Sequence, residues 1–202
     1  GISRVNLIDA TPIGVNVRST VATYSGVLDE LRRAFARTEE ARAGGLKPGA
    51  FSYNTGSLRC PTCDGTGQIT LDVQFLPDVD IECTECRGRR YGAQAASILR
   101  DGLSLPDIMA MSVDEARVAV RGLKKAGALL ETLSGLGLGY LTLGEATPAL
   151  SGGEAQRLKL ASEMGRRQDG TLFVFDEPTI GLHPDDVQVL IDVLQHLIER
   201  GA

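Results

Sequence analysis

The sequence has 202 residues, enough for one large domain or two modest ones with a buried core. Its 26 acidic and 21 basic side chains give a net charge of −5, so any contact with nucleic acid must come from local basic patches. No run of eighteen apolar residues occurs, and the first residues lack the pattern of a signal peptide. We therefore expect a cytoplasmic protein with no membrane partner, where paired cysteines more often hold a metal than form disulfides.

The first third of the chain predicts one strand and one helix. Residues 4–9 (RVNLID) indicate a short buried strand, and residues 10–21 carry the Pro, Gly, Asn and Ser typical of a loop that leaves a sheet. From Tyr24 to Arg37 the apolar residues recur at helical spacing, which predicts an amphipathic helix. An irregular, glycine-rich segment follows from Ala43 to Ser57.

The second half is mostly helical by pattern. Ser112 and Glu115 form a capping-box signature, which predicts helices from there to about Leu133, ending in the glycine-rich SGLGLGYL. A final helix is expected to begin at Pro184, with one apolar face running to Ile198.

All the cysteines fall in two C-x-x-C pairs separated by 19 residues: Cys60, Cys63, Cys83 and Cys86. This spacing is typical of a structural zinc site in which four thiolates fill every ligand position. A glycine follows each pair by two residues, where turned backbone is needed near sulfur. The stretch between the pairs predicts a β-hairpin. The alternative is two redox-active or merely buried cysteine pairs.

The stretch from Leu150 to Pro184 predicts two parts of a nucleotide site. LSGGEAQR places Ser151, Gly152 and Gly153 at the start of a helix, where free backbone N–H groups can face an anion. The apolar run from residue 172 to 175 then ends in Asp176 and Glu177, as a buried strand does when it delivers acids to the ligand edge of an α/β sheet. For the serine and glycines the alternative is an ordinary helix cap.

These two motifs, at this distance, resemble the signature motif and Walker B of ATP-binding-cassette ATPases. The cysteine module, FLPDV (75–79), CRGRRY (86–91) and DEPTIGLHPDD narrow the resemblance to the C-terminal half of the UvrA family or a UvrA-like paralogue. The fold that this implies is α/β: a partial ABC ATPase core with an inserted, mostly helical signature domain that carries a zinc-bound β-hairpin module.

The resemblance also implies domains. Residues 1–12 and 141–202 would belong to the ATP-binding core, and residues 13–140 would form the signature-domain insertion, with the zinc module at 57–92.

The resemblance further implies roles for single residues. Asp176 would hold Mg²⁺ and Glu177 would polarise the attacking water, because phosphoryl transfer depends on positioning. The implied contacts to ATP are Ser151, Gly152, Gly153, Glu154 and Gln156. Residues 179–183 resemble the D-loop, and residues 11–14 match the Q-loop region. Arg87, Arg89 and Arg90 become candidate contacts to the DNA backbone.

Two departures from the family pattern matter. Ala10 stands where the family usually has the Mg²⁺-sensing glutamine, and no G-x₄-G-K-[ST] occurs, so the phosphate-binding P-loop is missing. We therefore expect that this chain by itself does not hydrolyse ATP. The implied whole protein is a homodimeric ATPase of nucleotide excision repair that binds damaged double-stranded DNA and a UvrB-type helicase.

Two rival functions stay open. One is a DNA-binding and interaction module with a degenerate ATPase, including a paralogue with a drug-resistance role, which Ala10 motivates. The other is a chaperone-type zinc domain, because CPTCDGTG resembles the repeats of J-domain chaperones. Those chaperones carry four such repeats and no LSGGEAQR, so this second rival ranks last.

Overall fold

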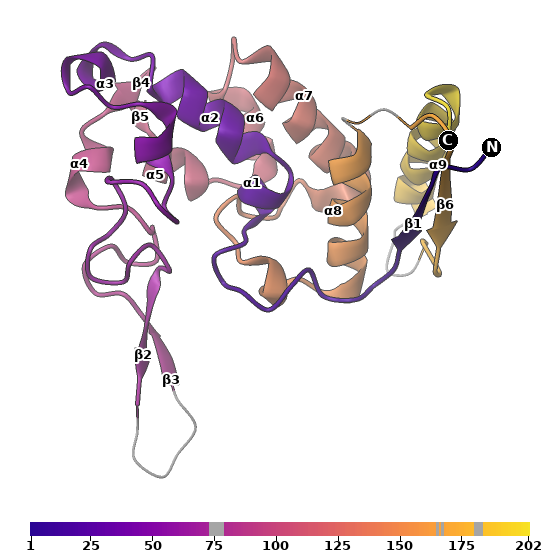
Figure 1. Ribbon diagram of the computed structural model, residues 1–202, viewed down its shortest axis with the longest axis horizontal. Helices are drawn as coiled ribbons and strands as arrows, with labels where there is room; N and C mark the ends of the chain where they lie inside the picture. Colours follow the sequence, from indigo (N-terminus) through magenta and orange to yellow (C-terminus); the bar gives the residue numbers. More distant parts are fainter. Residues whose placement is uncertain (73–78, 165, 167, 180–183) are drawn as a thin grey trace. The chain divides into compact units, whose positions relative to one another are not determined.

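The computed structural model describes residues 1–72, 79–164, 166, 168–179 and 184–202 (Figure 1). The tip of the expected hairpin and most of the expected D-loop lie outside these ranges. The chain divides into two compact units, one of residues 1–27 and 112–202 and the other of residues 28–111. The domain boundaries drawn from the resemblance remain a prediction.

The first unit contains a two-stranded parallel sheet. Strand β1 (Arg4–Ile8) pairs in register with β6 (Thr171–Phe175), two segments far apart in the sequence (Figure 1). The predicted strand at residues 4–9 is thus confirmed, but the prediction that it is buried holds for one face only. Val5 and Leu7 are 60% and 58% exposed, because the helices of the unit cover the opposite face of the sheet.

Helices make up most of the rest of this unit. They are α1 (Val21–Tyr24), α6 (Val113–Ala119), α7 (Lys124–Leu133), the π-helix η2 (Ser134–Leu138), the 3₁₀ helix η3 (Thr147–Ala149), α8 (Gly152–Met164) and α9 (Pro184–Glu199). The predicted capping box is present, since the Ser112 hydroxyl accepts from the Glu115 N–H and the Glu115 carboxylate accepts from the Ser112 N–H. The helix expected to stop at Leu133 continues into η2, where Gly137 adopts φ 72°.

The second unit surrounds an aromatic core. Its elements are α2 (Val27–Phe35), α3 (Glu39–Ala43), the 3₁₀ helix η1 (Pro48–Phe51), β2 (Gln68–Leu71), β3 (Val79–Glu82), α4 (Ala93–Ala96), β4 (Leu99–Arg100), β5 (Leu103–Ser104) and α5 (Leu105–Met109). Phe35 packs on Phe51 with ring centroids 6.0 Å apart, and Tyr53 meets Tyr91 edge to face at 5.9 Å. The Tyr91 hydroxyl donates to the Phe51 carbonyl at 2.9 Å, which satisfies its buried polar end.

One predicted helix is wrong at its start. The helix expected from Tyr24 to Arg37 is α2, which begins only at Val27, while Tyr24 ends the separate helix α1 and Ser25 and Gly26 lie between them. Gly26 adopts φ 83°, a left-handed conformation that glycine tolerates and that ends a helix. In the part of the chain that is described, no helix is long and apolar enough to cross a membrane.

Candidate metal centre and nucleotide site

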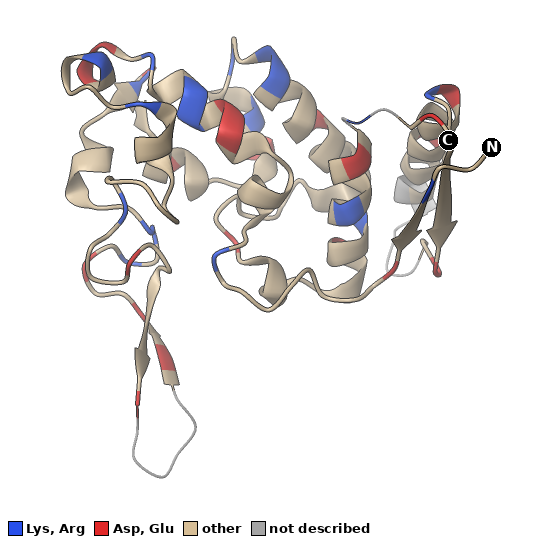
Figure 2. Ribbon diagram, in the orientation of Figure 1, with Lys and Arg blue, Asp and Glu red and all other residues tan. Residues whose placement is uncertain are grey.

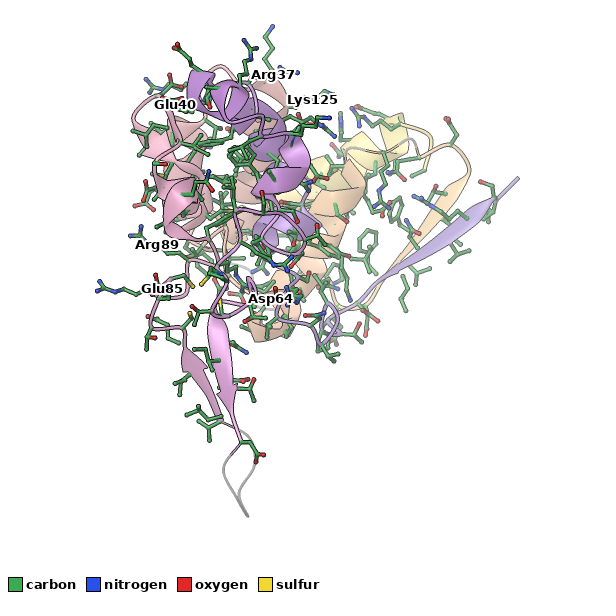
Figure 3. The ribbon with its side chains drawn as sticks, turned by 60° about the vertical axis from the view of Figure 1, so that its left-hand side comes forward. Arg37, Glu40, Asp64, Glu85, Arg89 and Lys125 are labelled. Carbon is green, nitrogen blue, oxygen red and sulfur yellow. The ribbon has the colours of Figure 1, made fainter. Side chains whose placement is uncertain are left out.

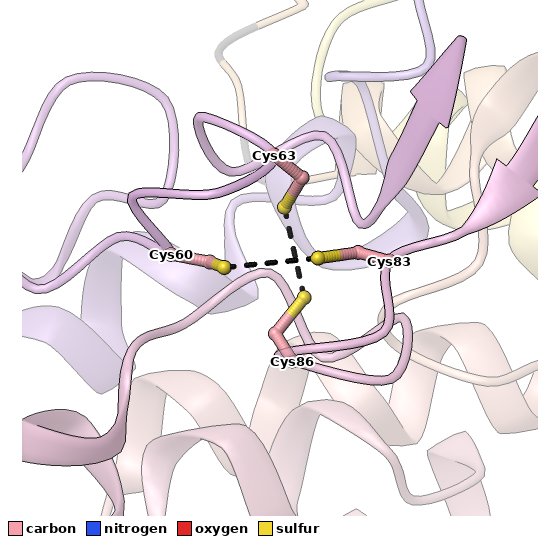
Figure 4. Close-up of side chains that lie close together, drawn as sticks. All are labelled: Cys60, Cys63, Cys83 and Cys86. Atoms are coloured by element: carbon pink, nitrogen blue, oxygen red, sulfur yellow. Dashed lines mark hydrogen bonds between the residues drawn. The ribbon is translucent and has the colours of Figure 1, made fainter. Parts of the chain in front are cut away.

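The four cysteines converge on one point in the second unit (Figure 4). All are buried, and their Sγ atoms lie within 4.8 Å of one another. The Cys60–Cys83 and Cys63–Cys86 Sγ pairs are 3.9 Å and 3.6 Å apart. A tetrahedral tetrathiolate site with zinc–sulfur bonds of about 2.3 Å has sulfur–sulfur edges of about 3.8 Å. The cluster therefore has the size and donor set of a closed four-coordinate metal site, and no cysteine forms a disulfide.

Two matching turns present these thiols. After Cys63, Asp64 and Gly65 adopt φ 51° and 79°, and after Cys86, Arg87 and Gly88 adopt φ 48° and 72°. Gly65 cannot be replaced without rearrangement, because a Cβ there would lie 1.8 Å from the Tyr53 carbonyl oxygen. The Cys-x-Gly pattern in the sequence reflects this geometry. The strands β2 and β3 extend from the two turns as the predicted antiparallel hairpin.

The surroundings of the sulfurs shift the pKa values of the cysteines in opposite directions. Burial raises the pKa of Cys60 and of Cys86. Burial opposes ionisation of Cys63 too, but hydrogen bonds from the Gly67 N–H and the Cys86 thiol outweigh it and lower the pKa of Cys63 to about 7. The Gly67 nitrogen lies 3.3 Å from the Cys63 sulfur. Such N–H donors stabilise thiolate, the form that binds a metal.

Arg90 is a buried cation beside this cluster. Only 7% of the residue is exposed, and its guanidinium carbon lies 5.2 Å from the centroid of the Tyr53 ring. Burial lowers the pKa of Arg90, while Tyr53, Cys63 and Cys86 act in the opposite direction and favour its positive charge. Its Nε atom has no hydrogen-bond partner among the described residues. Arg90 is therefore placed to balance negative charge on the sulfurs.

This placement corrects the prediction that Arg90 contacts DNA, because a buried guanidinium cannot reach a phosphate. Arg87 and Arg89 are exposed, and Arg89 pairs with Asp107 at 3.3 Å. Figure 3 shows Arg89 and Glu85 on the outer side of the cysteine module. In Figure 2 the described residues of the hairpin strands include acids but no Lys or Arg, so basic contacts from this module must come from its turns.

In the first unit the predicted signature motif begins helix α8. The Ser151 N–H donates to the Glu154 carboxylate at 2.6 Å, and the Ser151 hydroxyl accepts from the Glu154 N–H at 3.4 Å, which is a capping box. Among the described residues no acceptor contacts the N–H groups of Gly152 and Gly153. The cap and the predicted anion contact can therefore coexist, because the Ser151 hydroxyl accepts from Glu154 in the cap and still has its own hydrogen to donate, beside the N–H groups of the two glycines.

Gln156 faces inward rather than toward a ligand. It is 4% exposed, and its amide nitrogen donates to the Ile8 carbonyl at 3.1 Å and to the Asp176 carbonyl at 2.6 Å. These carbonyls lie at the carboxyl ends of β1 and β6, where the Asp176 N–H also donates to Ile8 at 3.3 Å. Gln156 thus holds the backbone of a predicted catalytic residue, and its direct contact with nucleotide stays a prediction.

Asp176 and Glu177 follow β6 at the exposed edge of the sheet. Glu177 adopts φ 45°, a left-handed conformation that costs a non-glycine residue on the order of 1 kcal/mol. Such conformations concentrate at functional sites, where they aim a side chain that relaxed backbone would turn elsewhere. This backbone conformation is an observation separate from the sequence motif, and it occurs at the residue that the motif predicts to polarise water.

Sequence reasoning missed Lys159. Its ammonium lies within hydrogen-bond distance of four oxygens of the loop after β1: the Asp9 carbonyl at 3.1 Å, the Asp9 Oδ1 at 2.6 Å, and the Thr11 carbonyl and hydroxyl both at 2.9 Å. Hydrogen bonds from Lys159 and Thr11 lower the pKa of Asp9 to about 2. The sequence did carry a signal for this contact. Lys159 comes three residues after Gln156, so both lie on the same face of a helix that packs on the sheet.

Comparison with known proteins finds extensive similarity to UvrA. The chain is 46% identical to UvrABC system protein A of Synechocystis over 201 residues, and 45% identical to that of Bacillus subtilis over the same length, each covering 99% of the chain. It superimposes on the crystal structure of UvrA2 from Deinococcus radiodurans with a TM-score of 0.88 and 42% identity, over 99% of the chain. Over its whole length the chain is homologous to UvrA proteins.

The UvrA relatives are much longer proteins. The chain spans 21% of the length of the Synechocystis and Bacillus relatives and 25% of the Deinococcus chain. No family model matches the sequence. Because identity to UvrA extends across both units, the mixed helix and sheet structure described above is UvrA-like throughout.

Proposed function

We propose that this chain is part of a UvrA-type protein that recognises damaged double-stranded DNA in nucleotide excision repair, using ATP. Its 46% identity to UvrABC system protein A supports the repair role. The proposal rests chiefly on one arrangement: Gln156 ties the signature helix to the backbone of Asp176, so both predicted nucleotide elements are built on one edge. We assign residues 1–12 and 141–202 to an ABC ATP-binding core and residues 13–140 to a signature domain.

In this proposal the two elements serve different ATP molecules. Asp176 would hold Mg²⁺ and Glu177 would polarise the attacking water at one site, while the N–H groups of Gly152 and Gly153 and the Ser151 hydroxyl would contact the γ-phosphate at the other. The 202 residues contain no P-loop, so the chain alone is inactive and each site needs residues from elsewhere in the protein. A homodimer working in the cytoplasm beside a UvrB-type helicase is the expected assembly.

The cysteine module serves this function as a structural zinc site. Four protein ligands leave no open position for a reacting water, so a bound zinc would fix the two turns and the hairpin rather than take part in chemistry. Arg87 on the second turn, and Arg89 just after it, would then present positive charge to DNA phosphates.

The decisive experiment is Glu177→Gln in the full-length protein. Removing the carboxylate charge while keeping the side-chain size should lower ATP turnover by at least about a hundredfold, with the KM for ATP little changed. Glu199→Gln, an exposed change of the same chemistry on α9, is the matched control and should leave turnover unchanged. Wild-type turnover in Glu177→Gln would refute the hydrolytic role.

A second candidate is a UvrA-like paralogue that binds DNA or other partners with a degenerate ATPase, including one that confers drug resistance. Two observations favour it: Ala10 replaces the expected glutamine, and the superimposed Deinococcus structure is a UvrA2. The same experiment separates the candidates, because a degenerate ATPase shows no turnover for Glu177→Gln to remove.

A further inference from the structure

Helix α8 is joined to β1 and the loop that follows it by a ladder of polar side chains. Glu163 accepts from Arg4 at 2.8 Å and from Asn6 at 3.1 Å, and Gln156 donates to Ile8. Lys159 lies between Gln156 and Glu163 on α8. Its ammonium binds Asp9 in the loop after β1, and 15% of its side chain is exposed. Apolar packing alone would let the helix slide, whereas these directional contacts fix one position of α8 along the strand.

The loop that Lys159 holds also touches the start of α8. A Cβ built on Gly152 would lie 3.0 Å from the Ala10 Cβ and 3.1 Å from its carbonyl oxygen. Ala10 therefore packs directly on the predicted signature glycine, with Asp9 and Thr11 on either side bound to Lys159. The Lys159 ammonium has three hydrogens to share among the four loop oxygens within its reach, so all its donors have acceptors in the loop. The Thr11 hydroxyl also donates to the Asp9 carboxylate at 2.6 Å.

We propose that Lys159 is a positioning residue for ATP hydrolysis, which locks the loop after β1 against the signature end of α8. The inference rests on the proposed ATPase function. On α8, Gln156 binds the backbone of Asp176 and Lys159 binds the loop of residues 9–11. The first residues of the same helix would face the other ATP site. A phosphate that shifts the start of α8 then shifts the Mg²⁺-holding edge with it. Lys159 itself contacts neither nucleotide nor water in this scheme.

The lock has a test that does not depend on hydrolysis. Hydrogen exchange of the peptide covering residues 9–14 is measured in the full-length protein for wild type, Lys159→Met and Lys159→Arg. Lys159→Met keeps the aliphatic stem and removes the charge, so exchange should accelerate about tenfold. Lys159→Arg should stay near wild type. The control is Lys125→Met, which removes an exposed lysine of α7 in the same unit. Unchanged exchange in Lys159→Met overturns the lock.

The consequence for hydrolysis is measured on the same proteins well below their melting temperatures. We expect Lys159→Met to lower kcat about ten- to a hundredfold, with the KM for ATP within about twofold, and Lys159→Arg to recover most of the loss. Unchanged kcat despite faster exchange, or a raised KM at normal kcat, overturns the positioning role. Wild-type turnover in Glu177→Gln would instead refute the proposed function, and the exchange result would still decide whether the lock exists.

Discussion

Replacing Arg90 by methionine tests the electrostatics of the cysteine site. The change keeps the unbranched stem that packs beside Gly67, where a Cβ would lie 3.3 Å from the Arg90 Cγ, and removes the guanidinium. A zinc ion bound by four thiolates leaves the site with a net charge of −2. A buried cation beside such a site stabilises the loaded form more than the empty one, because the empty form keeps protons on some of its sulfurs.

The size of the effect follows from the burial of Arg90 and its proximity to Cys63 and Cys86. At an effective dielectric constant of about 20, the Coulomb energy of one unit charge pair is about 4 kcal/mol at about 4 Å and halves when that distance doubles, so we expect a contribution on the order of 2 kcal/mol. That corresponds to about 30-fold in zinc affinity, within the range of about 10- to 100-fold that is usual for groups just outside the ligands of a metal.

The assay is competition with a chromophoric zinc chelator in the full-length protein at constant pH. Arg89→Met is the matched control: it removes an exposed arginine one residue away, whose charge water screens, and should change affinity less than threefold. Arg90→Lys should fall between wild type and Arg90→Met. If Arg90→Met releases zinc no more readily than Arg89→Met, the guanidinium is not a counter-charge to the sulfurs.

Two further predictions concern DNA binding and pH. In the full-length protein, replacing both Arg87 and Arg89 by Gln should reduce the slope of log DNA affinity against log salt by about 2, one unit for each lost phosphate contact. The control, Arg37→Gln with Arg42→Gln on the same unit, should leave the slope unchanged. If the Arg87 and Arg89 double variant also keeps the wild-type slope, the second turn does not contact DNA. The Asp9 carboxyl, whose pKa falls from 3.8 to about 2 on folding, adds stability that is fully present above about pH 4 and lost as the pH drops toward 2. Urea midpoints measured across that window should fall less steeply with acid in Asp9→Asn than in wild type, and parallel curves would contradict the Asp9–Lys159 pairing.

The local parts of the site could be predicted from the sequence. Two C-x-x-C pairs, each with a glycine two residues after its second cysteine, indicate turned backbone around a metal, and a serine three residues before a glutamate indicates a helix start at Ser112. These features depend on residues within a few positions of one another. Gly26 and Gly137 show the limit even there, since the left-handed backbone that each adopts can be known only once the neighbouring helices are placed.

The long-range parts could not be predicted. Arg90 belongs to a run of basic residues that suggests a DNA-facing surface, yet the neighbouring turn and Tyr53 bury it. Whether an arginine faces solvent or a sulfur cluster depends on the path of chain elements far from it in sequence. The same is true of Lys159, whose partners Asp9 and Thr11 precede it by some 150 positions.

The ladder on α8 also changes how the departure at Ala10 should be understood. By family resemblance, alanine at this position removes a Mg²⁺-sensing side chain. In the structure, the backbone and Cβ of residue 10 pack against Gly152, and the loop is held by Lys159 through Asp9 and Thr11 instead. Contact between the loop and the start of α8 is therefore made with alanine at position 10. Because phosphoryl transfer depends on placing groups already present, we predict that a loop held by its neighbours keeps the proposed hydrolysis working with alanine at position 10.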